Sequence, residues 1–359
     1  MLFGKRRRDT AGMPSDNAGT DFDEEYVNLV PNDRGARADG APMDCGAGIY
    51  AVDSGYVRPR LAAIHLITAN GRVALVDSAH NAALPRVEAA LAALGFAREA
   101  VEYLFLTHVH LDHAGGAGAM MQVFPNAHLV VHPRGARHMA DPGQLNTATA
   151  AVYGAERAAE LYGTLVPVPE ERIIATADGQ VFGLGGREIQ VLHTPGHAKH
   201  HQCFFDRDGR GAFTGDLFGM SYRELDRDGH NFVFPTTTPS QFNPGDFKRS
   251  IERVMALSPA ALYLTHFSRV LPSEAYLAQL RRMLDGHVAV ALAERHRGAD
   301  RQQHIRQGLA SLLRRELAAF GAGELIEQAV ALFVDDLELN AQGLDYWLAH
   351  GADGAPESA

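Results

Sequence analysis

Residues 108–113 read HVHLDH, which places four potential metal ligands within six positions. An apolar run over 103–107 precedes them, and Gly115 and Gly116 follow, so the sequence predicts a buried strand, a tight turn and the entry to a helix. Imidazole nitrogens suit borderline cations such as zinc and iron, and carboxylate oxygens suit harder ones. The pattern therefore predicts a metal site at the end of a strand. The alternative is a solvent-exposed turn rich in histidine.

Three other apolar runs also end in a potential ligand. They lead, in chain order, into His197, Asp216 and His266. A single histidine after a strand is more often a polar cap, and Asp216 alone could be a turn residue. The joint pattern is specific, because loops on a rigid sheet can gather such side chains along one edge.

Composition limits the class of protein. Hydrophobic residues make up 46% of the 359-residue chain and charged residues 21%, as in globular domains. The formal net charge of −10 argues against nucleic acid or an anionic membrane as partner. No apolar stretch reaches the roughly 18 residues of a membrane span. Cys45 and Cys203 are expected as free thiols, and the basic start lacks the apolar region of a secretory signal, so we expect a cytoplasmic protein.

Local signals also predict the main elements. The Asn70-Gly71 pair predicts a hairpin between strands over 63–68 and 73–76. From about residue 272 onward the spacing is helical and the strand signals cease. We therefore expect a helical C-terminal region with these segments: 273–295, 301–320 and 323–349.

The ligand motifs are THxHxDHxGG over 107–116, TPGH over 194–197, TGD over 214–216 and TH over 265–266. In this order and at these intervals they resemble the motifs of the metallo-β-lactamase-fold metallohydrolase superfamily. The resemblance implies an α/β protein, a four-layer αβ/βα sandwich with a C-terminal helical extension. The resemblance implies a catalytic domain over 44–270. Composition predicts a disordered leader over 1–43, and the helical spacing predicts a helical cap or subdomain over 271–359.

The resemblance also implies a ligand set for two divalent metal ions. Three histidines would hold one ion: His108, His110 and His197. A carboxylate and two histidines would hold the other: Asp112, His113 and His266. Asp216 would bridge the ions, and Asp77 would orient a ligand imidazole, the alternative being a carboxylate that caps a turn. Zinc is the first choice of metal, and iron or manganese also fits these ligands.

A site of this kind implies hydrolysis. Metal coordination lowers the pKa of bound water to about 7, so a metal-bound hydroxide can attack at neutral pH. The resemblance is closest in character to lactonases and glyoxalase II-like thioesterases, which favours a small ester, thioester or lactone as the small-molecule substrate. Asp112 and Asp216 are the carboxylates expected at the reacting centre. A β-lactamase is disfavoured, since those enzymes are exported.

Four further residues are candidates for contacts with the substrate. The Tyr222 hydroxyl could donate to a substrate oxygen, or the ring could be a packed aromatic. Tyr56 and Arg58 could bind a substrate carboxylate. His201 could face the site or hold a ligand from behind.

Other functions stay open at this point. An iron-dependent redox enzyme of the persulfide dioxygenase type would use the same fold, as would a phosphodiester or phosphotriester hydrolase. The net charge argues against a nucleic-acid substrate, and the 50 positions between Asp216 and His266 leave no room for a large inserted domain. A binding protein without turnover would be expected to have lost ligands. The stretch over 236–244 could form a pocket rim, the helical region could cap the pocket, and a homo-oligomer is compatible with the sequence.

Overall fold

The computed structural model describes residues 41–351, which form two β-sheets and eleven α-helices. The first sheet has seven strands in chain order: β1 (Met43–Gly46), β2 (Ile49–Asp53), β3 (Ala63–Ala69), β4 (Arg72–Val76), β5 (Val101–Phe105), β6 (His128–Val131) and β7 (Ile173–Ala175). β1 to β4 pair antiparallel, and β4 to β7 pair parallel. The predicted hairpin is confirmed: Ala69 pairs with Arg72, and Asn70 and Gly71 both have positive φ, as a two-residue hairpin loop requires.

The second sheet has six strands, in the order β13-β12-β11-β10-β9-β8. Their bounds are β8 (Val181–Leu184), β9 (Arg187–His193), β10 (Gln202–Asp206), β11 (Gly211–Gly215), β12 (Ala261–Leu264) and β13 (Ser268–Val270). β11 and β12 run parallel, and the other neighbours run antiparallel. The carboxyl ends of β11 and β12 therefore lie at the same edge.

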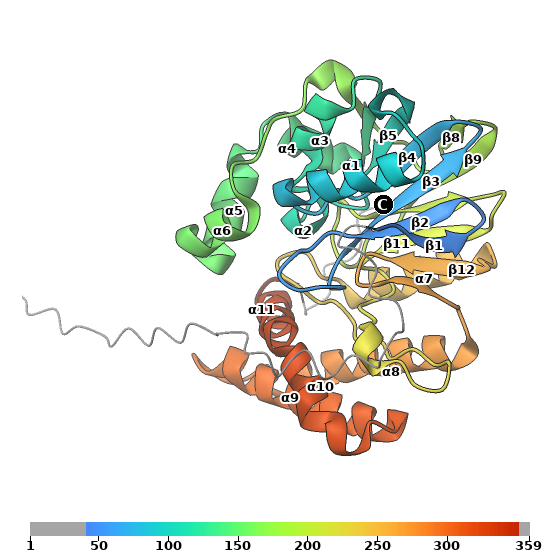
Figure 1. Ribbon diagram of the computed structural model, residues 1–359. Coiled ribbons are helices and arrows are strands. Elements are labelled where there is room, and N and C mark those ends of the chain that lie inside the picture. The colour runs from blue at the N-terminus through green and yellow to red at the C-terminus, as the bar shows by residue number, and fades with distance from the viewer. Residues whose placement is uncertain (1–40, 352–359) are drawn as a thin grey trace, which may run out of the picture. The chain divides into compact units, whose positions relative to one another are not determined.

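The two sheets pack face to face around a shared apolar cluster. Phe105 of the first sheet and Phe204 of the second meet there, with ring centroids 4.7 Å apart. Helices α1 (Leu84–Ala93) and α3 (Ala117–Val123) pack on the outer face of the first sheet. Helix α7 (Pro244–Ala256) packs on the outer face of the second, which completes the predicted αβ/βα sandwich (Figure 1).

Five helices lie between β5 and β7, and four form the C-terminal region (Figure 1). Besides α3, the first five are α2 (Leu111–Ala114), α4 (Pro133–Ala140), α5 (Gly143–Tyr153) and α6 (Ala155–Tyr162). The C-terminal four are α8 (Glu274–Ala293), α9 (Arg301–Phe320), α10 (Ile326–Leu332) and α11 (Val334–His350). The predicted helical segments after residue 272 are thus confirmed. Within residues 41–351, no helix is both long and apolar enough to cross a membrane.

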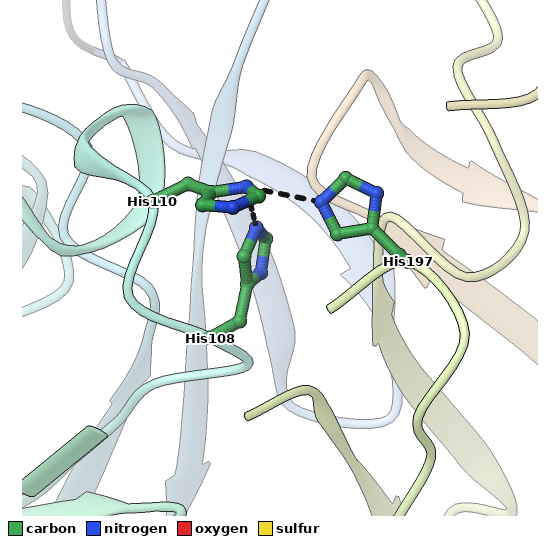
Figure 2. Close-up of side chains that lie close together, drawn as sticks. All are labelled: His108, His110 and His197. Atoms are coloured by element: carbon green, nitrogen blue, oxygen red, sulfur yellow. Dashed lines mark hydrogen bonds between the residues drawn. The ribbon is translucent and has the colours of Figure 1, made fainter. Parts of the chain in front are cut away.

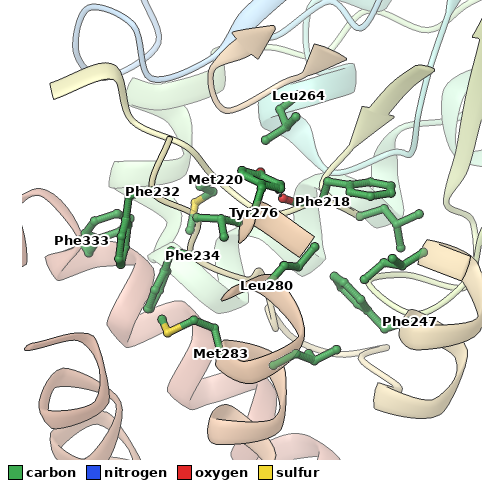
Figure 3. Packing of buried hydrophobic residues seen from close by; sticks show 14 of the residues in the cluster. Phe218, Met220, Phe232, Phe234, Phe247, Leu264, Tyr276, Leu280, Met283 and Phe333 are labelled. Atoms are coloured by element: carbon green, nitrogen blue, oxygen red, sulfur yellow. Dashed lines mark hydrogen bonds between the residues drawn. The ribbon is translucent and has the colours of Figure 1, made fainter. Parts of the chain in front are cut away.

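The C-terminal helices share one apolar cluster with the outer face of the second sheet. Leu264 of β12, Leu280 and Met283 of α8, and Phe333 before α11 all belong to it (Figure 3). The helices are therefore part of the same core as the sheet that carries three of the predicted ligands. The predicted division into domains stays a prediction, and the leader predicted over 1–43 lies, except for its last residues, outside the described part of the chain.

Candidate metal centre

All seven predicted ligands meet at one end of the sandwich. Four of them follow β5, and the other three follow β9, β11 and β12. Their ligand atoms form three overlapping groups, within each of which all atoms lie within 4.8 Å of one another: His108, His110 and His197; His108, His113 and Asp216; Asp112, His113 and His266. Parallel strands place their carboxyl ends together, which is why residues far apart in sequence converge here.

The first group consists of three imidazoles. His110 Nδ1 lies 3.0 Å from His108 Nε2 and 3.0 Å from His197 Nε2 (Figure 2). Zinc–nitrogen bonds of about 2.0–2.1 Å at a tetrahedral angle separate nitrogen ligands by about 3.3 Å. The spacing is therefore close to that of three ligands on one cation.

The second group consists of one carboxylate and two imidazoles. Asp112 Oδ2 lies 3.4 Å from His113 Nε2 and 3.3 Å from His266 Nε2. Asp216 faces both groups: its Oδ1 lies 3.2 Å from His113 Nε2, and its Oδ2 lies 3.4 Å from His197 Nε2. One carboxylate therefore presents one oxygen to each group, as a bridging ligand does.

Two buried atoms in the centre have no hydrogen-bond partner, His113 Nε2 and Asp216 Oδ1. Leaving a buried polar atom unsatisfied costs about 1–3 kcal/mol, so such atoms need an explanation. The opposite nitrogens of the ligand imidazoles are occupied: His113 Nδ1 lies 2.9 Å from Asp77 Oδ2, and His266 Nδ1 lies 2.8 Å from Leu61 O. The ligand atoms thus point inward, and the donor set fits divalent metal ions.

Charge is distributed unequally over the side chains of the centre. Burial, helped by neighbouring histidines, lowers the pKa of His108 well below its usual range and that of His110 to about 3. Burial also opposes a charge on His113, but the carboxylates beside it outweigh this effect and raise its pKa well above the usual value. Burial would raise the pKa of Asp216, yet the imidazoles lower it. The first group is therefore neutral imidazole, and Asp216 is an anion at neutral pH.

Asp77 orients two of the ligands. Besides His113, it accepts from Thr107 N at 2.8 Å and from the Thr107 hydroxyl at 2.9 Å. Since the hydroxyl donates to Asp77, its lone pair can accept from His108 Nδ1, 3.1 Å away. This arrangement leaves Nε2 of both histidines free as ligand atoms, in the manner of carboxylate–histidine–metal triads.

The four residues predicted to contact the substrate lie in different surroundings. The Tyr56 hydroxyl lies 2.5 Å from the Tyr162 hydroxyl, in a small apolar cluster that includes Leu111. Leu111 is next to Asp112 in sequence, so this cluster adjoins the second group. These contacts are compatible with a wall beside the site, and the role of Tyr56 stays a prediction.

Arg58 and Tyr222 contact one another. The Arg58 guanidinium lies 4.3 Å from the centroid of the Tyr222 ring and pairs with Glu224 at 2.7 Å. The Tyr222 side chain is buried, and its hydroxyl donates to Asp336 at 2.9 Å. A substrate would therefore have to compete with Asp336 for the Tyr222 hydroxyl and with Glu224 for Nη1 of Arg58, whereas Nη2 of Arg58 is buried and has no hydrogen-bond partner among the described residues.

His201 lies behind the centre. Its Nδ1 is 2.9 Å from the Thr194 hydroxyl, and its Nε2 is 3.4 Å from the backbone nitrogen of Asp216. The structure thus places it with the partners that support a ligand, which is one of the two positions expected for it.

Sequence reasoning missed three threonines that support the ligands. Thr107 and Thr265 both donate to Asp77, the latter at 2.8 Å. The Thr236 hydroxyl lies 3.0 Å from His197 Nδ1. The position of Thr107 and Thr265 directly before the ligands His108 and His266 could have indicated their supporting role. Thr236 lies 39 positions from His197, so nothing in the local sequence indicates that the two are in contact.

A two-sheet αβ/βα sandwich with a histidine and aspartate centre at the carboxyl ends of its strands defines a metal-dependent hydrolase of one structural class. The sequence model of the Metallo-beta-lactamase superfamily matches residues 57–266. The chain belongs to this superfamily.

Individual relatives share only a small part of their sequence with this chain. A metallo-beta-lactamase fold-containing protein of Sulfurisphaera tokodaii is 26% identical over 247 residues, which cover 66% of this chain and 85% of that protein. An atrochrysone carboxyl ACP thioesterase of Aspergillus fumigatus is 31% identical over 143 residues, which cover 40% of this chain and only 35% of the thioesterase. Among solved structures, a metallo-beta-lactamase family protein of Thermus thermophilus has a TM-score of 0.55 at 23% identity, covering 87% of this chain and 96% of that one. The last likeness concerns the fold alone.

Proposed function

We propose that the protein is a dinuclear metal-dependent hydrolase that cleaves a small ester, thioester or lactone, with zinc as the preferred metal. The observation that carries the proposal is the position of Asp216. Its two carboxylate oxygens face the two ligand groups separately, at 3.4 Å from His197 and 3.2 Å from His113. Two cations held close together repel one another, and a shared carboxylate offsets part of that repulsion.

Divalent ions bound by these residues would supply an activated water and would polarise the substrate oxygen. The protein would supply orientation and charge. Asp77 and Thr107 hold the imidazoles in the tautomer that ligation requires. Asp112 has a side chain that is 24% exposed, more than its fellow ligands His113 and His266, so it lies toward the open side of the centre. There it can accept a hydrogen bond from the attacking water and align it.

The surroundings favour an uncharged acyl group. The cluster beside Asp112 contains two tyrosines and two leucines and is apolar apart from the paired hydroxyls. Arg58, the residue predicted to bind a substrate carboxylate, is neutralised by Glu224. The thioesterase among the relatives supports a thioester within this class of substrates.

The proposed partner is a small molecule rather than nucleic acid or a membrane, in keeping with the net charge of −10. A cytoplasmic location stays a prediction, as does a homo-oligomer. Both cysteines, Cys45 and Cys203, are free.

Elemental analysis of protein purified without added metal, combined with a small substrate panel, tests the proposal. We expect two equivalents of metal and turnover of a thioester, ester or lactone, with Asp216→Ala inactive. One equivalent of iron with oxygen uptake on a persulfide would refute the proposal in favour of the redox alternative. Turnover confined to a phosphodiester or phosphotriester would refute the proposed substrate class.

A further inference from the structure

Helix α11 contacts the catalytic core through a polar stripe on one face. Asp336, Asn340 and Gly343 are spaced by four and three positions, so they share one side of the helix. The first of them accepts from the Tyr222 hydroxyl. The other two lie against the segment over 235–238, which belongs to no helix or strand.

Asn340 binds this segment with both ends of its side chain. Its Oδ1 accepts from Thr237 N at 2.6 Å, and its Nδ2 donates to Pro235 O at 2.9 Å. The Thr237 hydroxyl also donates to the backbone carbonyl of Asn340, at 3.2 Å. Asn340 is 1% exposed. These three hydrogen bonds hold the backbone on both sides of Thr236, a segment that no helix or strand stabilises.

Gly343 allows the helix to come this close. A Cβ at this position would lie 1.7 Å from Thr237 O and 2.6 Å from the carbonyl carbon of Thr238. Backbone therefore contacts backbone, and only hydrogen fits between them. The position of the segment is thus set by α11 and not by a deformable side chain.

Thr236 transmits this position to the metal centre. Its hydroxyl has a single hydrogen, and Asp216 O, 3.0 Å away, can only accept, so the hydroxyl donates there. Its lone pair then accepts from His197 Nδ1 at 3.0 Å. The imidazole proton is thereby fixed on Nδ1, and Nε2 is left free toward the other ligands. One hydroxyl thus contacts both a ligand of the first group and the shared carboxylate residue.

We propose that Asn340 is a positioning residue of the metal centre, which acts through Thr236 on His197 and Asp216. On this view α11 supports metal binding directly and is more than a cover over the pocket. The inference rests on the proposed function only as far as the presence of the metal ions. It makes no use of the substrate.

Metal affinity measured with cobalt(II) alone tests the proposal. Metal-free protein is titrated while visible absorbance and competition with a chromophoric chelator are followed. Asn340→Ala is expected to weaken the binding of one of the two cobalt equivalents by about tenfold, which is the lower end of the range for residues that support a metal ligand. It is also expected to change the cobalt spectrum. Thr236→Val is expected to weaken the same equivalent at least as much. In the Thr236→Val background, Asn340→Ala should lower the affinity much less than in the parent, because the hydroxyl is the shorter of the two contacts from Thr236 to His197 Nδ1, at 3.0 Å against 3.5 Å for the backbone oxygen.

Leu337→Ala is the matched control. Leu337 lies in the same helix and is 3% exposed as a residue. Its replacement leaves the polar stripe intact, so it should lower thermal stability without changing metal affinity. If Asn340→Ala does not fold, Asn340→Asp keeps the size of the side chain but loses the donor to Pro235 O, and the same weakening is expected.

Three results would overturn the proposal: parent-like affinity in a folded Asn340 variant, equal weakening by Leu337→Ala, or full additivity with Thr236→Val. A parent protein that binds two cobalt ions but hydrolyses no ester, thioester or lactone would overturn the proposed function alone. The two proposals can therefore fail separately.

Discussion

Asp77→Asn tests how the ligands of the centre are oriented. Oδ1 of Asp77 accepts from Thr107 N at 2.8 Å, so the amide oxygen of the variant must take that place. The amide nitrogen then faces His113 Nδ1, where Asp77 Oδ2 now lies at 2.9 Å. Two N–H groups cannot donate to one another, so the His113 proton moves to Nε2. That nitrogen is the ligand atom, and a protonated nitrogen cannot bind a cation.

The effect should be confined to one of the two groups. The Thr107 hydroxyl can still donate to the amide oxygen, since it lies 3.0 Å from Asp77 Oδ1, and can still accept from His108 Nδ1. We therefore expect the equivalent that uses His113 to weaken by about 10–100-fold, which is about 1.4–2.7 kcal/mol. The equivalent that uses the first group should keep its affinity.

Competition with a chelator of known affinity measures the two equivalents separately, and turnover of the thioester or lactone should fall in parallel. Asp206→Asn is the control, because Asp206 is also a fully buried carboxylate, paired with Arg187 in the second sheet. It should lower stability and leave both metal affinities unchanged. Parent affinities in Asp77→Asn, or equal weakening of both equivalents, would refute the tautomer argument.

Three further predictions test other parts of the structure. Asp216→Ala should lower metal affinity and turnover by more than the loss of a residue that only supports a ligand, which is about 10–100-fold. Unchanged metal content by elemental analysis would exclude Asp216 as the bridging ligand. Gly118→Ala places a Cβ 1.8 Å from a backbone carbonyl oxygen and should cost about 1–3 kcal/mol in urea unfolding. Gly298→Ala, with no atom within 4 Å, should stay within about 0.5 kcal/mol of the parent, and equal effects of the two would contradict the packing argument. Burial raises the pKa of Asp336 to about 6. Its ionised form therefore destabilises the fold, and relative to Asp336→Asn the metal-free parent should lose on the order of 2 kcal/mol of unfolding free energy as the pH rises from 4 to 8. If the difference in unfolding free energy between the parent and Asp336→Asn does not vary with pH, ionisation of Asp336 does not destabilise the fold.

The metal ligands could be predicted because each carries a local signal. His108 to His113 lie together in one turn. Asp216 directly follows β11, His266 comes two residues after the end of β12, and His197 comes four residues after the end of β9. A strand that ends at a sheet edge delivers the next residue to that edge, so strand and ligand can be inferred together. The hairpin at Asn70-Gly71 was predictable for a similar reason, since its turn depends on two adjacent residues only.

Contacts between distant residues could not be predicted in this way. The hydroxyl of Tyr222 donates to Asp336, which lies 114 positions away in sequence, and Arg58 donates to Glu224, which lies 166 positions away. Residue type indicated that these side chains could bind a substrate, but the partners that occupy them depend on how the helices pack. Short strands posed a related difficulty. β13 has only three residues, and a run of that length has no periodicity to distinguish it from a loop.

Helix α11 shows how a conflict with local preference can indicate such a contact. Its spacing predicts a helix, yet Asn340 and Gly343 both lie inside it, and glycine in a helix interior costs about 1 kcal/mol relative to alanine. A chain selected only for helix formation would avoid both residues. Here the asparagine makes two side-chain hydrogen bonds to the segment over 235–238, and the glycine leaves room for the backbone of that segment. Residues that weaken an element locally are expected where tertiary packing or function requires them. The weak positions of this helix are therefore positions at which it contacts the segment that holds Thr236 beside His197.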